Sequence, residues 1–185
     1  MLEQIDIDPI TQLRPIEPSD AEPMFQLIDR NRSYLREWLP WLDFNRSPED
    51  SASFISRSID QARQGTGAVA AIYYADNIAG VIGYNSVDSI NRICEIGYWL
   101  DQDLQGNGII LRNTHELIDF AFSSLNINRI CIPVATKNVR SRAMPEKLGF
   151  VEEGILREAE WLYDHFVDHV LYSKLCIDRV GERAE

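Results

Sequence analysis

The sequence has no long apolar run, no secretory leader pattern and few cysteines. No stretch approaches the roughly 20 apolar residues that a membrane-spanning helix needs. The first ten residues, MLEQIDIDPI, are acidic and lack the basic and apolar regions of a signal peptide. The three cysteines, Cys94, Cys131 and Cys176, are scattered and odd in number, which argues against a disulfide framework or a metal site. We therefore expect a cytoplasmic protein with free thiols, no membrane partner and no metal.

Cationic side chains are in the minority. The chain has 18 Lys and Arg residues against 29 Asp and Glu residues, which gives a net charge of −11. Such a surface repels a phosphate backbone, so we expect no nucleic-acid partner. The same charge would attract cationic substrates such as amines or polyamines, but it also has a simpler role in solubility.

The first third of the sequence predicts helices. Ser19 and Glu22 have the spacing of a capping box for a helix that runs to about Asn31. Ser47 followed by Pro48 is typical of the start of a second helix, which Gly65 and Gly67 end. Internal repeats, low-complexity tracts and linkers are absent, so the 185 residues predict one α+β domain.

A period of two residues predicts strands from Ala68 onward. Ala68–Tyr74, Ile78–Val87 and Arg92–Leu100 alternate in polarity and are joined by short links, so they predict an antiparallel meander. In the third strand, Cys94, Ile96, Tyr98 and Leu100 face one side, while Ile93, Glu95, Gly97 and Trp99 face the other.

A glycine loop, Gln105–Ile110, stands between the third strand and a helix. A helix N-terminus has unpaired N–H groups and the positive end of the helix dipole. Glycines there let the backbone approach an anion, so the loop suits a phosphate or pyrophosphate.

The last third of the sequence predicts three more strands and a helix. Arg129–Thr136 is the first strand, and Pro133 within it argues against complete pairing on both edges. Asn138 opens a helix that ends at Gly149. The final strands are about Phe150–Trp161 and His165–Leu175.

Four motifs occur in order: Glu95–Leu100, Gln105–Ile109, Asn138–Arg142 and Glu146–Phe150. Together they resemble the GCN5-related N-acetyltransferase (GNAT) superfamily, and most closely its RimJ/RimL-like branch of ribosomal-protein N-terminal acetyltransferases. Trp38–Trp41, Arg157–Glu160 and Asp164-His165 fit that branch too. The resemblance implies a single N-acetyltransferase domain over residues 1–185, with a core of about residues 10–175.

The resemblance also implies the fold and the donor. The fold would be a three-layer α/β/α domain with a mixed, mostly antiparallel sheet, splayed between its fourth and fifth core strands, Arg92–Leu100 and Arg129–Thr136. Acetyl-CoA would be the cosubstrate, with its pantetheine arm in the gap. The residues implied to hold it are Tyr98, Trp99, Leu100, Gln105, Gly106, Asn107, Gly108, Ile109, Ile110, Asn138 and Ser141. Each assignment has a structural alternative. These are an ordinary strand-to-helix turn for the loop, a core aromatic for Tyr98 or Trp99, a helix N-cap for Asn138 and a solvent-facing helix serine for Ser141.

The catalytic candidates are Glu95, Ser141 and Glu160. Glu95 or Glu160 would take a proton from an amine, and Ser141 would give one to the leaving thiolate. Glu95 could instead have a structural role, and alternation alone does not separate Glu160 from Glu158 on the same face. Two histidines of the last strand, His165 and His169, share a face and are more typical of packed or paired residues.

Tyr34, Trp38 and Trp41 are candidates for the acceptor wall, with helix–sheet packing as the alternative. The expected reaction is direct attack of an amine on acetyl-CoA, because the sequence contains no nucleophile motif. A protein or peptide N-terminus is the favoured acceptor. A polyamine, antibiotic or amino acid is the alternative, as is an acetyl-CoA-binding regulator without turnover. We expect a monomer or a homodimer.

Overall fold

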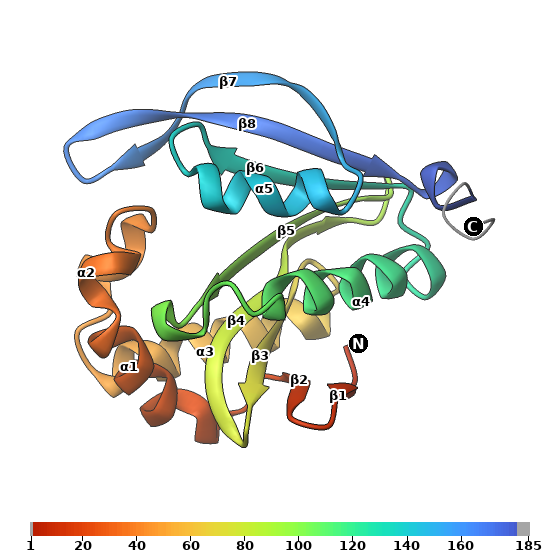
Figure 1. Ribbon diagram of the computed structural model, residues 1–185. Coiled ribbons are helices and arrows are strands. Elements are labelled where there is room, and N and C mark those ends of the chain that lie inside the picture. The colour runs from red at the N-terminus through yellow and green to blue at the C-terminus, as the bar shows by residue number, and fades with distance from the viewer. Residues whose placement is uncertain (1, 181–185) are drawn as a thin grey trace.

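The computed structural model describes residues 2–180, which form an open eight-stranded sheet with helices on both faces (Figure 1). The strands are β1 (Ile5–Asp8), β2 (Thr11–Pro15), β3 (Ala68–Tyr74), β4 (Asn77–Asp88), β5 (Ile93–Leu100), β6 (Arg129–Ala135), β7 (Val151–Leu162) and β8 (His165–Leu175). Their order in the sheet is β1-β2-β3-β4-β5-β6-β8-β7. Within the described residues, all pairs are antiparallel except β5 with β6. The predicted α+β class and mixed sheet are therefore confirmed.

In the described part of the chain, five α-helices lie around the sheet: α1 (Ala21–Arg30), α2 (Arg32–Leu35), α3 (Pro48–Gln64), α4 (Ile109–Ser123) and α5 (Val139–Lys147). Short 3-10 helices cover Pro18–Asp20, Pro40–Phe44, Gln102–Leu104 and Cys176–Val180. No helix within residues 2–180 is long and apolar enough to cross a membrane.

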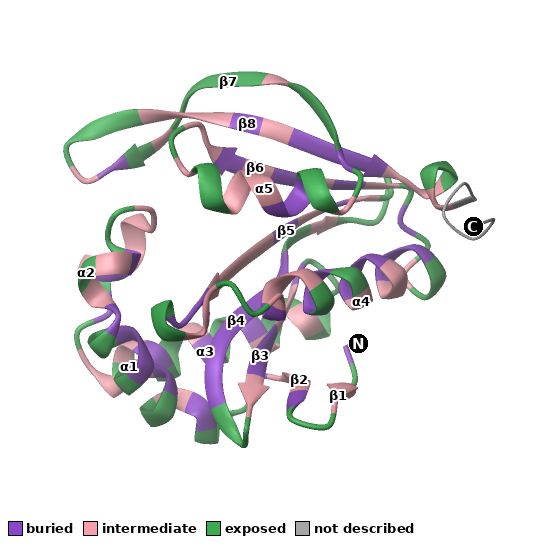
Figure 2. Cartoon of the chain, in the orientation of Figure 1, coloured by how far each residue is buried: buried purple, intermediate pink, exposed green. Residues whose placement is uncertain are grey.

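Two hydrophobic cores lie on opposite faces of the sheet. One packs α4, including Leu117, and α5 against inward-facing residues of β5 and β6, including Ile96 and Ile132. The other packs α1 and α3 against β3 and β4 around Met24, Ile55 and Val81. Figure 2 shows the consequence: β4 has a long buried run and β5 and β6 are buried or intermediate, whereas β7 at the edge is mostly exposed.

At the N-terminus, one prediction was wrong and one strand was missed. The capping pair is not Ser19 and Glu22, because the carboxylate of Asp20 accepts from the backbone N–H of Glu17 at 2.8 Å and the α-helix begins only at Ala21. Strand β1 was missed because its sequence, IDID, is short and half acidic. The predicted start of α3 is confirmed, with Asp50 accepting from the N–H of Ser47 at 3.0 Å.

The central feature of the sheet is an interruption between β5 and β6. These strands pair only from Ile93–Glu95 to Arg129–Cys131. Beyond that point, β5 stays paired with β4 and β6 with β8, so the two halves of the sheet separate. Pro133 lies past the last paired residue, where its missing N–H removes no ladder bond to β5. The predicted splay, and the reason for a proline in a central strand, are both confirmed.

Candidate active site

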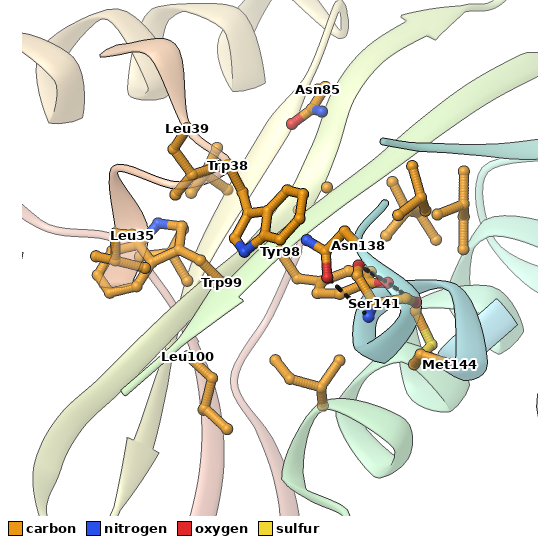
Figure 3. Close-up of a pocket in the computed structure, with 18 of the residues that line it drawn as sticks. Leu35, Trp38, Leu39, Asn85, Tyr98, Trp99, Leu100, Asn138, Ser141 and Met144 are labelled. Atoms are coloured by element: carbon orange, nitrogen blue, oxygen red, sulfur yellow. Dashed lines mark hydrogen bonds between the residues drawn. The ribbon is translucent and has the colours of Figure 1, made fainter. Parts of the chain in front are cut away.

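A cavity of about 820 Å³ runs from the glycine loop, across the end of β5, to the segment that follows α2. Figure 3 shows Trp38 and Leu39 on one side of β5, with Asn138 and Ser141 of the α5 region on the other. Every residue predicted for the site lines this cavity except Asn107, whose side-chain amide donates to the carbonyl of Leu104 at 3.1 Å.

The glycine loop presents unpaired backbone donors. Gly106 (φ 83°) and Gly108 (φ 68°) adopt left-handed conformations that suit glycine. Among the described residues, no acceptor takes the backbone N–H groups of residues 106–111. The side-chain oxygen of Gln105 is buried and has no hydrogen-bond partner among the described residues, but it is an acceptor and adds nothing to this set of donors. A ring of free donors at the start of α4 fits an anionic group such as a pyrophosphate.

Tyr98, at the open end of β5, contacts the first turn of α5. Its hydroxyl donates to the carbonyl oxygen of Ser141 at 3.1 Å and lies 3.0 Å from the Ser141 hydroxyl (Figure 3). Burial raises the pKa of Tyr98, so its hydroxyl keeps its proton at neutral pH. When Tyr98 donates to Ser141 Oγ instead, the serine proton is free to turn into the cavity.

Asn138 is the N-cap of α5, because its side-chain oxygen accepts from the backbone N–H of Ser141 at 3.1 Å. The cap leaves its amide N–H₂ without an acceptor among the described residues, at the wall of the cavity. Asn138 therefore caps α5, and its side-chain N–H₂ group remains available to donate to a ligand.

Glu95 lies on the opposite face of β5 from Tyr98, beside the last β5–β6 pair. Its carboxylate accepts from the side-chain amide of Asn85 at 3.1 Å. Asn85 sits in a bulge of β4, between Tyr84 and Ser86. A Cβ at Gly97 would stand 2.4 Å from the Asn85 amide nitrogen, so only glycine leaves room for this contact. Asn85 was not predicted, although a glycine inside a strand does signal a close approach.

Glu160 lines the cavity from β7, and its carboxylate lies 3.4 Å from Nε2 of His169 on β8. Glu158, the alternative on that strand, has φ 50° and its N–H bonded to Asp168, and it does not line the cavity. The structure thus separates two glutamates that strand alternation alone could not.

Aromatic residues close the other end of the cavity. Tyr34, Trp38 and Trp41 line it, and Trp41 lies 6.3 Å from Trp99, centroid to centroid. Tyr34 and Trp41 also pack against the α1–α3 core, so these two residues both line the cavity and contribute to helix–sheet packing. Tyr163, in the β7–β8 turn, donates to the carbonyl of Leu39 at 2.6 Å and thereby joins the two walls.

A loop suited to an anion, beside a split between parallel strands and with carboxylates across the gap, is the arrangement that the sequence resemblance implies for an acyltransferase. Comparisons with known proteins agree. Residues 11–151 match the family described as Acetyltransferase (GNAT) domain. The ribosomal-protein-serine acetyltransferase of Escherichia coli (strain K12) is 31% identical over 175 residues, which cover 95% of this chain and 98% of the relative.

Solved structures give the same result. The microcin C7 self-immunity acetyltransferase MccE, solved with acetyl-CoA and AMP, has a TM-score of 0.89 and 31% identity over 92% of this chain and 95% of its own. RimL, solved with coenzyme A, has a TM-score of 0.88 and 27% identity over 94% and 98%. The chain belongs to the GNAT acetyltransferases, and it is an acetyl-CoA-dependent N-acetyltransferase.

The glycine loop should be intolerant of any side chain at Gly106. A Cβ there meets nothing within 4 Å, so the Gly106→Ala variant should fold, with a left-handed strain of about 1–2 kcal/mol. The methyl group enters the space that a pyrophosphate needs, so acetyl-CoA affinity in calorimetry should fall about tenfold or more. Gly65→Ala is the matched control, because Gly65 has φ 71°, open space and no place in the cavity. Equal affinity of the two variants would remove the loop from the donor site.

The Gly97→Ala variant tests the Asn85–Glu95 contact. The added methyl displaces the flexible Asn85 amide, so we expect a lower kcat with an unchanged dissociation constant for acetyl-CoA. Asn85→Ala should give a similar loss, and the double variant should be no worse than either single one. Full turnover by Gly97→Ala would show that the contact is not needed.

Proposed function

We propose that the acceptor is the N-terminal α-amine of a protein or peptide. The observation that carries this proposal is the charge balance of the cavity. Its charged lining residues are three acidic and three basic: Asp50, Glu95, Glu160, Arg57, Arg140 and Lys147. The net charge of −11 is therefore carried elsewhere, and the cavity offers no cluster of carboxylates for a polyamine. A peptide chain, which brings a single α-amine into the cavity, fits this charge balance better than a polyamine with several cationic amines.

The acceptor side also has room for a chain. Cys131, Pro133, Ala135, His169 and Leu171 alternate with core residues along β6 and β8, so they share the sheet face that Glu95 occupies. All five are partly exposed. Pro133, Ala135 and His169 line the same cavity as the aromatic segment after α2, so an extended N-terminus could enter between them. The names of two relatives support the proposal: one is a ribosomal-protein-serine acetyltransferase, and RimL is described as an alpha-N-protein acetyltransferase.

The bound donor supplies the acetyl thioester, and the chain's residues do the rest. Backbone groups at the free end of β5 orient the thioester and stabilise charge on its oxygen. Glu160 accepts the amine proton, while Glu95, held by Asn85, orients the amine. Ser141, turned by Tyr98, gives a proton to the departing sulfur and takes one back from solvent, so its hydroxyl is restored. An α-amine has a pKa of about 8 against about 10.4 for lysine, so a half-exposed carboxylate suffices as base.

A substrate panel tests the acceptor. Peptides with free N-termini should release coenzyme A thiol, and fragment mass spectrometry should place the acetyl group on the α-amine. The matched control is the same peptide with a blocked N-terminus and one internal lysine, which should remain unmodified. Spermidine and an aminoglycoside complete the panel. Turnover of spermidine with no turnover of any free N-terminus would contradict the proposal.

A further inference from the structure

His169 lies beside the proposed base. It occupies β8, opposite Ala135 of β6 and Leu156 of β7, and its side chain is 14% exposed against 31% for Glu160. Its Nε2 is 3.4 Å from the nearer Glu160 oxygen, and it is buried with no completed hydrogen bond to any described residue. A buried imidazole nitrogen that faces a carboxylate in an active-site cavity, and has no other partner, calls for an explanation.

A bulge in β7 brings the two groups together. Leu156 pairs with His169, yet the next pair is Glu160 with Val167, so four steps along β7 match two along β8. In a regular ladder, Glu158 would stand opposite Val167. Instead, Glu158 has φ 50°, and its backbone N–H donates to the Asp168 carboxylate at 2.7 Å. The bulge thus places Glu160 instead of Glu158 opposite Val167, and the hydrogen bond to Asp168 stabilises the strained backbone of Glu158.

The surroundings leave His169 as the group able to share a proton with Glu160. The neighbouring β6 residues on this face, Pro133 and Ala135, carry no charge. Tyr163 interacts with Glu160 from the β7–β8 turn, but burial raises the pKa of its hydroxyl, which already donates to Leu39. Histidine is the side chain that exchanges protons near neutral pH.

We propose that His169 is a positioning residue beside Glu160 that receives the proton which Glu160 takes from the amine. This inference rests on the proposed function, in which Glu160 is the base. As the new N–C bond forms and the C–S bond breaks, one proton passes from the amine to Glu160. The same proton then moves to the free electron pair of Nε2, which restores the carboxylate and leaves an imidazolium. Solvent at the mouth of the cavity takes the proton from His169.

A double-mutant cycle tests the coupling. His169→Gln should lower kcat about tenfold with little change in KM for the acceptor, because glutamine fills the site but takes up no proton. In a Glu160→Gln background, the same substitution should cause no further loss. Calorimetry with acetyl-CoA should show unchanged affinity in all variants and so exclude misfolding. A full-rate His169→Gln variant, or an equal loss in both backgrounds, would overturn the proposal.

Two variants at Asp168 test the bulge. Asp168→Asn keeps an oxygen that accepts from the backbone N–H of Glu158, so this variant should retain most of kcat. Asp168→Ala has no such oxygen, and its kcat should fall by as much as that of His169→Gln. Equal rates for the two variants would show that the bulge does not position Glu160. The cycle can be run with any amine that the panel identifies. Additive losses in the double-mutant cycle would therefore contradict only the proposed role of His169. A substrate panel in which no N-terminus is acetylated would contradict only the proposed acceptor.

Discussion

The site depends on one feature of the sheet: the pairing between β5 and β6 stops after only three residue pairs. After Glu95 and Cys131, the strand edges separate, and backbone groups of residues 96–100 that face β6 have no strand partner. Buried backbone donors and acceptors are rarely left unpaired, so this edge is a built template for a ligand with amide groups. The interruption persists because each strand is held from its other side, β5 by β4 and β6 by β8.

The gap also lets the two faces of the sheet meet at one point. Tyr98 points toward α5 and its Ser141, on the face that α4 covers, whereas Glu95 and Trp99 point toward the aromatic segment and α3. The donor loop begins one helix and the capping residue Asn138 begins another, so both helix N-termini open on the same cavity. In the proposed reaction, the donor and the acceptor approach from opposite faces and react between the strands.

Local signals explain what could be predicted from the sequence. The loop at Gln105–Ile110, the cap at Asn138 and the proline in β6 each depend on a few neighbouring residues, and the structure places them as expected. The bulges at Asn85 and Glu158 and the Tyr163–Leu39 bond depend on which strands become neighbours. Gly97 signals a close approach in β5 but does not name Asn85, and the sequence holds no local sign of the other two features. The partners of Glu95 and Glu160 were missed for this reason, and the Ser19 cap was wrong because an aspartate one residue later competes for the same turn.

Amide hydrogen exchange, resolved by residue, tests the central claim most directly. In the free protein, N–H groups of β5 that face the gap, within residues 97–100, should exchange faster than those of Ile93–Glu95, which β6 already pairs. Saturating acetyl-CoA should slow exchange at residues 97–100 and at 106–111, and leave Ile93–Glu95 unchanged. Slow exchange across residues 97–100 in the free protein, or no added protection with acetyl-CoA, would contradict the claim that this gap holds the donor.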